Sequence, residues 1–245
     1  MKVKALITAA GLGKRLGFLT RNTNKGLLKV SGQPLILDIL KKLRAQGIDD
    51  IFIVTGYQAG HFRKHLDLYF DKGAKTLFNP FFRVSGILVS FWIARPFLDG
   101  ENFIFTTTDH FFHPSVLKDC LHHQKHRCKI RVVVQKKQRY TREDSKVMIQ
   151  KDRILKFGKD LPLSHVNGEF GGMAYFSSEA SRLFFRLLEI HLEKDGLQGY
   201  MMDILNKMKD QFQMPICFST CGEHSRIEID SVHDLIKARE MEKKR

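Results

Sequence analysis

The feature that most constrains the fold is a regular alternation of short apolar runs with longer amphipathic stretches. We expect strands near residues 3–9, 51–55, 75–78, 103–108, 130–135, 146–150, 171–177, 215–218 and 226–229. We expect helices over residues 34–46, 58–70, 86–95, 114–126, 178–194, 199–210 and 231–242. Because strands that alternate with helices build a sheet covered on both faces, the sequence predicts an α/β fold. The expected architecture is Rossmann-like and doubly wound, with a mostly parallel mixed sheet.

Two of the expected helices carry signals at their first turns. The stretch 34–46 places a set of apolar residues on one helical face, and Pro34 suits the first helical position. That set is Leu35, Ile36, Ile39, Leu40 and Leu43. Ser231 precedes Asp234 by three residues, which resembles a capping box with Asp in place of the usual Glu. We therefore expect the last helix to begin at this serine.

The segment 136–168 differs from the rest of the chain. Its first part, KKQRYTREDSK, is highly charged, and KDRILKFGKDLP is typical of a hairpin or an irregular excursion. We interpret 136–168 as an insertion over one face of a single domain that spans residues 1–245.

The charge balance favours small anionic ligands. The chain carries 41 Lys+Arg against 26 Asp+Glu, a formal net charge of +15, and the basic residues are spread along its whole length. No zinc-finger spacing, aromatic RNP strand or basic heptad accompanies them, so we expect no nucleic-acid partner. A dispersed positive charge is also typical of enzymes with polyanionic substrates.

Apolar runs and cysteines bear on the compartment. The longest apolar runs are far shorter than the ~20 residues that span a bilayer, and ALITAA at 5–10 is too short for a signal peptide. We therefore expect a cytoplasmic protein without a transmembrane segment. Four cysteines give no disulfide framework, so we expect Cys120, Cys128, Cys217 and Cys221 to be free and mostly buried thiols.

A glycine-rich turn, LITAAGLGKRLG at 6–17, follows the first expected strand. Glycines let the backbone approach a ligand closely, and consecutive N–H groups can hold an oxyanion. A Walker phosphate loop is excluded because Arg15 follows Gly13-Lys14. The dinucleotide fingerprint is excluded because the third glycine, Gly17, comes one residue late.

The segment AAGLGKRL at 9–16 resembles the A-A-G-x-G-x-R-L signature of the sugar-phosphate nucleotidylyltransferase superfamily. NKGLLKV at 24–30 and GQPLI at 32–36 are similar to the next two motifs of that superfamily, although Asn24 and Gly26 stand where proline is usual. The resemblance implies the fold of nucleotide-diphospho-sugar transferases. It also implies a nucleotide site made of Ala9, Ala10, Gly11, Gly13, Arg15, Lys25, Gly86 and Asp109, in which Arg15 and Lys25 are catalytic.

Three carboxylates suggest a metal site. Asp109 follows the strand at 103–108, at the edge of the sheet where open α/β folds bind ligands. Glu228 and Asp230 are two residues apart on an expected strand and therefore face the same side. Two like charges so close are unfavourable unless a cation lies between them or water screens them. The resemblance implies that Asp109, Glu228 and Asp230 hold Mg²⁺.

Further motifs narrow the resemblance to a branch. TDH at 108–110, SKV at 145–147 and FGKDL at 157–161 are similar to motifs of inositol-1-phosphate cytidylyltransferases, in which Lys146 and Lys159 would bind the acceptor. Thr108 and Phe170 depart from that branch, and EIDSV at 228–232 instead resembles phosphocholine cytidylyltransferases. A choline head favours a Trp or Tyr cage. Because the chain has 1 Trp, 5 Tyr and 20 Phe, we expect inositol-1-phosphate. The pairs Phe81-Phe82 and Phe111-Phe112 are the alternative cage candidates.

The expected function is Mg²⁺-dependent transfer of CMP from CTP to a phosphate monoester, which gives CDP-inositol and pyrophosphate when the acceptor is inositol-1-phosphate. Phosphocholine or a sugar phosphate is the alternative acceptor. With any of these acceptors, 136–168 is expected to lie on the acceptor side. A non-catalytic nucleotide-binding module on the same fold would bind CTP without releasing pyrophosphate. Lys25 and the three carboxylates argue against that module. A homodimer is compatible with the sequence.

Overall fold

The first apolar run forms β1 (Lys4–Ala9), which lies between two parallel neighbours in the main sheet. The computed structural model describes residues 2–69, 74–122 and 128–243. Within these residues the main sheet has nine strands, of which seven follow the order β10-β9-β11-β6-β1-β4-β5, while β8 pairs with β11 and β12. The α/β class and the mixed sheet expected from the sequence are confirmed.

The other strands of the described residues are two to nine residues long. They are β2 (Lys29–Val30), β3 (Gln33–Pro34), β4 (Ile51–Thr55), β5 (Ala74–Phe78), β6 (Phe103–Thr107), β7 (His110–Phe112), β8 (Ile130–Gln135), β9 (Lys146–Gln150), β10 (Arg153–Gly158), β11 (Gly168–Phe176), β12 (Ile216–Cys221) and β13 (Arg226–Glu228). Because β6, β1, β4 and β5 run parallel, their carboxyl ends meet at one edge of the sheet.

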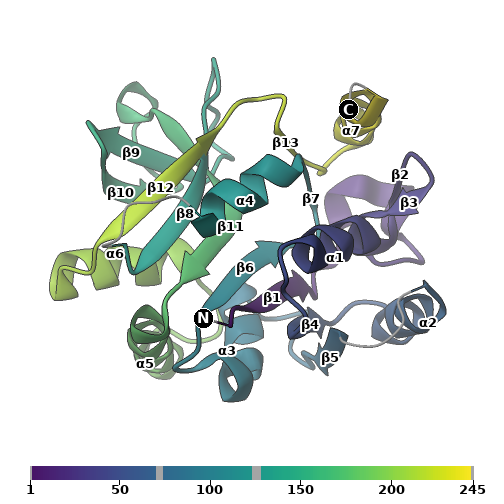
Figure 1. Cartoon of the computed structure of the whole chain (residues 1–245), viewed down its shortest axis with the longest axis horizontal. Helices are drawn as coiled ribbons and strands as arrows, with labels where there is room; N and C mark the ends of the chain where they lie inside the picture. The colour runs from purple at the N-terminus through teal and green to yellow at the C-terminus, as the bar shows by residue number, and fades with distance from the viewer. Residues whose placement is uncertain (1, 70–73, 123–127, 244–245) are drawn as a thin grey trace.

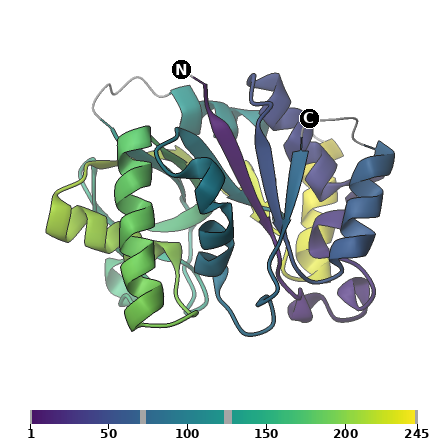
Figure 2. The same cartoon turned by 90° about the horizontal axis from the view of Figure 1, so that it is seen from below.

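Helices cover both faces of the main sheet, as Figures 1 and 2 show. One face packs against α3 (Ile87–Leu98), α5 (Ser178–Lys194) and α6 (Met201–Phe212). The other face packs against α1 (Leu35–Ala45), α2 (Ala59–Tyr69) and α4 (Pro114–His122). A third apolar cluster joins α7 (Val232–Lys243) to the 3₁₀ segment and strands that follow β1.

The helix starts agree closely with the sequence signals. The apolar face expected for α1 is buried, although Pro34 precedes the helix as its N-cap and does not occupy its first position. Ser231 and Asp234 form the expected capping box, in which each side chain accepts a hydrogen bond from the other's backbone N–H. The helix expected to end at residue 95 continues through Pro96 to Leu98. The end expected at 126 falls outside the described residues.

A small sheet beside the main one brings two distant segments together. β7 and β13 pair antiparallel, with Glu228 opposite His110 and Arg226 opposite Phe112. The next backbone bond, from Ile229 N to the carbonyl oxygen of Asp109, measures 2.8 Å. This pairing places the two segments that carry the candidate metal ligands side by side.

Residues 136–168 join the main sheet through a hairpin. β9 and β10 pair antiparallel, and β9 also pairs with the first two residues of β11. The sequence favoured a hairpin or irregular excursion here but did not define β10 as a strand.

The expectation of four free thiols is wrong for two of them. Cys128 and Cys217 form a disulfide, and their Cα atoms are 5.8 Å apart, a normal separation for such a bond. Cys120 and Cys221 are free and buried, as expected. The pairing depends on where β8 and β12 lie side by side, which cysteine spacing in the sequence does not reveal. No helix among the described residues combines the length and apolarity needed to cross a membrane.

Candidate active site

The carboxyl end of β1 opens into a cavity of about 180 Å³. Ala9, Ala10 and Gly11 line it together with Gly86, at the start of α3, and Asp109. Gly13 does not line this cavity. It adopts a left-handed conformation with φ of 64° and accepts a 2.8 Å hydrogen bond from the Thr20 hydroxyl. Gly13 therefore shapes the turn that carries the following basic residues.

Gly86 lies where two backbone segments approach closely. Its N–H donates to the carbonyl oxygen of Leu197 at 2.8 Å. A Cβ atom at this position would lie 2.9 Å from the carbonyl oxygen of Gly199, closer than real Cβ contacts allow. The absence of a side chain keeps this wall of the cavity in place.

Asn24 holds the turn around Lys25 in place. The Asn24 amide donates to the carbonyl oxygens of Ala9 at 2.7 Å and Tyr57 at 3.0 Å, and its side-chain oxygen accepts from Gly26 N. The side chain is buried and caps a short 3₁₀ helix, Lys25–Leu27. Three hydrogen bonds thereby fix Lys25 next to the glycine turn.

Lys25 lies between two carboxylates, one from the middle of the chain and one from near its C-terminus. Its Nζ atom is 3.1 Å from Asp109 Oδ2 and 2.7 Å from Asp230 Oδ1. Arg15, whose side chain is 66% exposed, contacts the other oxygen of Asp230 at 2.8 Å. The structure thus brings together Arg15, Lys25, Asp109 and Asp230, four of the residues selected from the sequence.

Burial and charge shift the pKa values of these groups in different directions. Burial alone would lower the pKa of Lys25, but Asp109 and Asp230 raise it above its usual value, so the ammonium remains charged. Burial alone would raise the pKa of Asp109, but the charge of Lys25 lowers it. Burial raises the pKa of Asp230 despite its contact with Lys25.

Glu228 completes the carboxylate cluster. Burial alone would raise its pKa, but its cationic neighbours, Arg226 and Lys25 among them, hold the pKa of Glu228 well below its usual range. One oxygen from each of Asp109, Glu228 and Asp230 lies within 4.8 Å of the others.

The donor set suits a hard divalent cation. Mg²⁺ prefers oxygen ligands and is usually held by one or two carboxylates with water completing its shell. The Lys25 ammonium already contacts two of the three carboxylates, which shows that the cluster attracts a cation. The residues present therefore fit a magnesium site.

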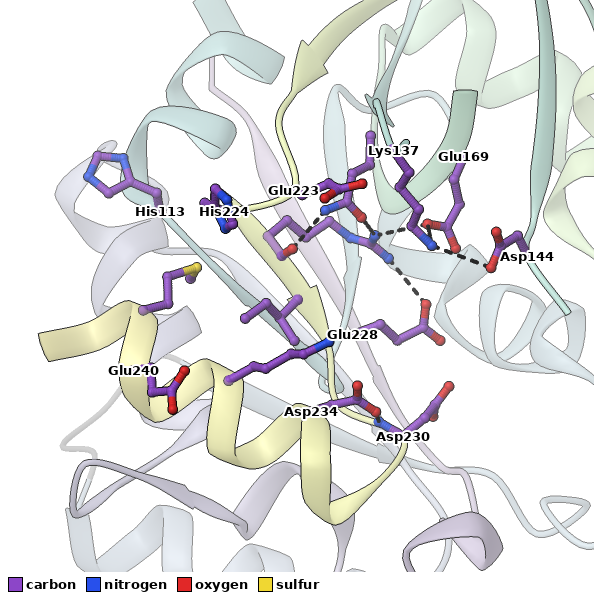
Figure 3. A pocket seen from close by; sticks show the side chains of 15 residues that line it. His113, Lys137, Asp144, Glu169, Glu223, His224, Glu228, Asp230, Asp234 and Glu240 are labelled. Atoms are coloured by element: carbon purple, nitrogen blue, oxygen red, sulfur yellow. Dashed lines mark hydrogen bonds and ion pairs between the residues drawn. The ribbon is translucent and has the colours of Figure 1, made fainter. Parts of the chain in front are cut away.

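A second cavity, of about 820 Å³, borders the carboxylate cluster (Figure 3). Glu228 and Asp230 form part of its wall, and α7 contributes Asp234 and Glu240. Lys137 lies between Glu169 and Asp144 in this cavity and contacts both. Burial alone would lower the pKa of Lys137, but these two partners raise it.

The predicted acceptor lysines are not brought to the carboxylate cluster. Lys146 is 1% exposed, and its ammonium donates to the carbonyl oxygens of Arg142 and Lys159. The Lys159 ammonium lies 5.1 Å from the ring centroid of Tyr200, the residue that precedes α6. Neither lysine lines either cavity, so their role toward the acceptor remains a prediction.

The phenylalanine pairs proposed as cage candidates differ in location. Phe111 and Phe112 are buried, and the Lys42 ammonium lies 4.8 and 4.6 Å from their ring centroids. Phe81 is exposed, while Phe82 lines the smaller cavity. The buried pair is therefore unsuited to a ligand cage.

Two buried polar side chains that contact the carboxylate cluster were not predicted from the sequence. His110 and Arg226 are both buried, and Arg226 Nη2 is 2.7 Å from His110 Nε2 and 3.2 Å from Glu228 Oε2. His110 belongs to the TDH motif at 108–110 but was assigned no role, and the signal for Arg226 is its position two residues before Glu228.

Comparisons with known proteins identify the family and agree with the fold. The model of the MobA-like NTP transferase domain matches residues 5–217, most of the chain, and ends before Glu228 and Asp230. The solved inositol-1-phosphate CTP transferase from T. maritima superposes with a TM-score of 0.79 at 22% identity, covering 98% of this chain and 96% of that one.

Two curated relatives match the chain over shorter stretches. Choline-phosphate cytidylyltransferase of Streptococcus pneumoniae is 34% identical over 109 residues, 42% of this chain and 46% of that enzyme. The enzyme of the same name from Haemophilus influenzae is 36% identical over 97 residues, 40% of each chain. The matched stretches therefore span less than half of these relatives. The family match covers most of the chain, which thus belongs to the MobA-like NTP transferase domain family.

Proposed function

We propose that the protein transfers CMP from CTP to a small phosphate monoester and releases pyrophosphate. One observation carries this proposal: Lys25 lies among Asp109, Asp230 and Glu228 directly beside the glycine turn and its cavity. This arrangement supplies cationic groups for a triphosphate and oxygen ligands for a divalent cation.

The smaller cavity suits a single-ring base. Its volume of about 180 Å³ is below the roughly 300 Å³ at which pockets for drug-sized ligands begin. Backbone atoms of Ala9 to Gly11 lie on one side of it, and Asn79 and Ser85 add polar groups. The close packing of Gly86 against Gly199 limits its expansion toward a purine.

Charge neutralisation is the main task of the surrounding residues. Arg15 and Lys25 would hold the triphosphate, and the turn at Gly11 and Gly13 would offer backbone N–H groups. Mg²⁺ held by Asp109, Asp230 and Glu228 would act as a Lewis acid on the phosphate oxygens. Because the pKa of Lys25 is raised, its ammonium remains positive while these groups approach.

The acceptor itself needs no protein base. The second pKa of a phosphate monoester lies near 6, so its oxygens are largely dianionic at pH 7. One of them attacks the α-phosphorus of CTP in line, the new P–O bond forms and pyrophosphate leaves with the electrons of the broken bond. Catalysis then consists of positioning and electrostatic stabilisation, as in phosphoryl transfer generally.

We infer inositol-1-phosphate as the first acceptor to test, because no Trp or Tyr among the described residues lines either cavity. Phosphocholine is the second candidate, for two specific reasons. The two curated relatives above are named choline-phosphate cytidylyltransferases. The exposed ring of Tyr200 already binds an ammonium group, that of Lys159.

Pyrophosphate release from CTP, UTP and ATP, each with either acceptor, tests the proposal, and Asp109→Asn serves as the inactive control. We expect CTP with one of the two phosphate monoesters to give turnover that depends on Mg²⁺. Turnover with ATP equal to that with CTP would contradict the assignment of the base cavity. Binding of CTP without any pyrophosphate release would support a non-catalytic nucleotide-binding module instead.

A further inference from the structure

A buried arginine connects two of the three candidate metal ligands. Arg226 is 2% exposed and is among the largest fully buried side chains. Its guanidinium donates to Gln135 Oε1 through Nη1, and through Nη2 to His110 Nε2 at 2.7 Å and Glu228 Oε2 at 3.2 Å. The Gln135 amide in turn donates to the Arg226 carbonyl oxygen at 2.8 Å, so the arginine is held at both ends.

The chemistry of arginine determines the direction of the next bond. A guanidinium group has only donors, so His110 Nε2 must accept and the ring proton lies on Nδ1. His110 Nδ1 is 3.1 Å from the Thr107 hydroxyl oxygen, to which it donates. The Thr107 hydroxyl then donates to Asp109 Oδ1. An oriented chain of hydrogen bonds therefore runs from Arg226 to Asp109.

The fold leaves space for the His110 ring within this series of hydrogen bonds. β11 has a register shift between Phe170 and Ala174 against β8, and Gly172 in this irregularity has φ of 64°. A Cβ atom on Gly172 would lie 1.6 Å from His110 Cε1. The absence of a side chain at Gly172 thus leaves the space that the ring occupies.

We propose that Arg226 is a positioning residue for the metal site. It orients Glu228 directly, and it orients Asp109 through His110 and Thr107, so that both carboxylates present oxygens at a fixed spacing. Asp109 Oδ2, which the Thr107 hydroxyl does not bind, contacts Lys25. One oxygen from each of the three carboxylates lies within 4.8 Å of the others, a spacing at which they could hold one ion. This inference rests on the proposed metal-dependent function. Groups behind metal ligands that fix their orientation typically change metal affinity 10–100-fold when they are removed.

Three variants separate positioning from folding. Thr107→Val removes the hydroxyl link with little change in shape, and Thr107→Ser keeps the hydroxyl as the matched control. Arg226→Lys retains the positive charge but replaces the planar guanidinium, whose Nη1 and Nη2 bind Gln135 on one side and His110 and Glu228 on the other, with a single nitrogen. The readout is the equilibrium dissociation constant for Mn²⁺ in the presence of CTP, measured from the EPR signal of free Mn²⁺. Circular dichroism and the melting temperature check folding.

We expect Thr107→Val and Arg226→Lys to weaken Mn²⁺ binding about 10–100-fold, and Thr107→Ser to change it less than about threefold. Wild-type Mn²⁺ affinity in a folded Thr107→Val or Arg226→Lys protein would overturn the proposal, as would a wild-type protein that binds no Mn²⁺. If Arg226→Lys does not fold, Thr107→Val decides alone, because Thr107 is only half-buried. If the wild-type protein binds Mn²⁺ but releases no pyrophosphate, the proposed function is refuted. The Mn²⁺ dissociation constants of the variants would still test the positioning role of Arg226.

Discussion

Asp230→Asn tests whether the carboxylate cluster serves catalysis more than stability. Asp230 contacts Lys25 at 2.7 Å and Arg15 at 2.8 Å, and it is one of the three candidate metal ligands. An asparagine keeps one oxygen that can accept from Lys25 but removes the negative charge. Because burial raises the pKa of Asp230, the folded state disfavours its ionised form, and neutralising it should cost little stability at pH 7.

The expected loss of activity is much larger. The pair with Arg15 is solvent-exposed and contributes about 0–1 kcal/mol. Loss of a charged ligand to a cation that neutralises a triphosphate should cost about 3–5 kcal/mol of transition-state stabilisation. At 1.36 kcal/mol per factor of ten, kcat should fall by about 10²–10⁴. A melting temperature within a few degrees of wild type should accompany this loss.

Glu228→Gln provides the contrast within the same cluster. The pKa of Glu228 is lowered in the folded state, so its ionised form stabilises the fold above pH 4.5 and this stabilisation is lost as the pH falls. Glu228→Gln should therefore lower the melting temperature at pH 7 more than Asp230→Asn does. Differential scanning fluorimetry and a pyrophosphate-release assay measure both properties. A folded Asp230→Asn enzyme with kcat within threefold of wild type would refute the reasoning.

Three further outcomes follow from the structure. Burial raises the pKa of the Cys120 thiol to about 12 and that of Cys221 to about 11. Iodoacetamide at pH 8 should therefore label these two thiols only after unfolding, which mass spectrometry without reductant measures. Gly172→Ala should lower the free energy of unfolding, measured in urea, by more than about 2 kcal/mol because the added methyl group meets the His110 ring. The control Gly60→Ala, where the added methyl group meets nothing, should change the free energy of unfolding by less than about 1 kcal/mol. If Lys159 binds the acceptor phosphate, as the sequence resemblance implies, Lys159→Ala should raise the acceptor KM about 10–100-fold with little effect on the KM for CTP, and the exposed Lys156→Ala should change neither.

Much of the fold could be predicted because it depends on local patterns. The fully buried strands β1 and β4 are continuous apolar runs, and α1 shows its buried face as a helical repeat. The capping box at Ser231 acts within three residues and was visible in the sequence. Short strands such as β2 and β7 were missed, since two or three residues leave no periodic pattern.

The candidate site was predictable where a single segment determines it. The glycine turn and Lys25 lie within one stretch of the N-terminal part of the chain, and Asp109 follows a strand whose end is recognisable. The pair Glu228 and Asp230 is visible as two carboxylates on one side of a strand. What the sequence could not provide is the partner of each group, such as Asn24, which binds carbonyl oxygens at residues 9 and 57.

The network around His110 shows why such partners escape sequence analysis. A buried histidine beside an aspartate has the same local signature whether it fills space or fixes a metal ligand. The contacts of His110 depend on the pairing of β7 with β13, which sets Glu228 opposite His110. They also depend on a glycine in β11 that leaves space for the ring. These contacts join segments from four strands, and each segment is compatible with other pairings when considered alone. The geometry at the metal site is therefore a property of strand register, and changes at Gly172 or Arg226 should affect it without touching either substrate.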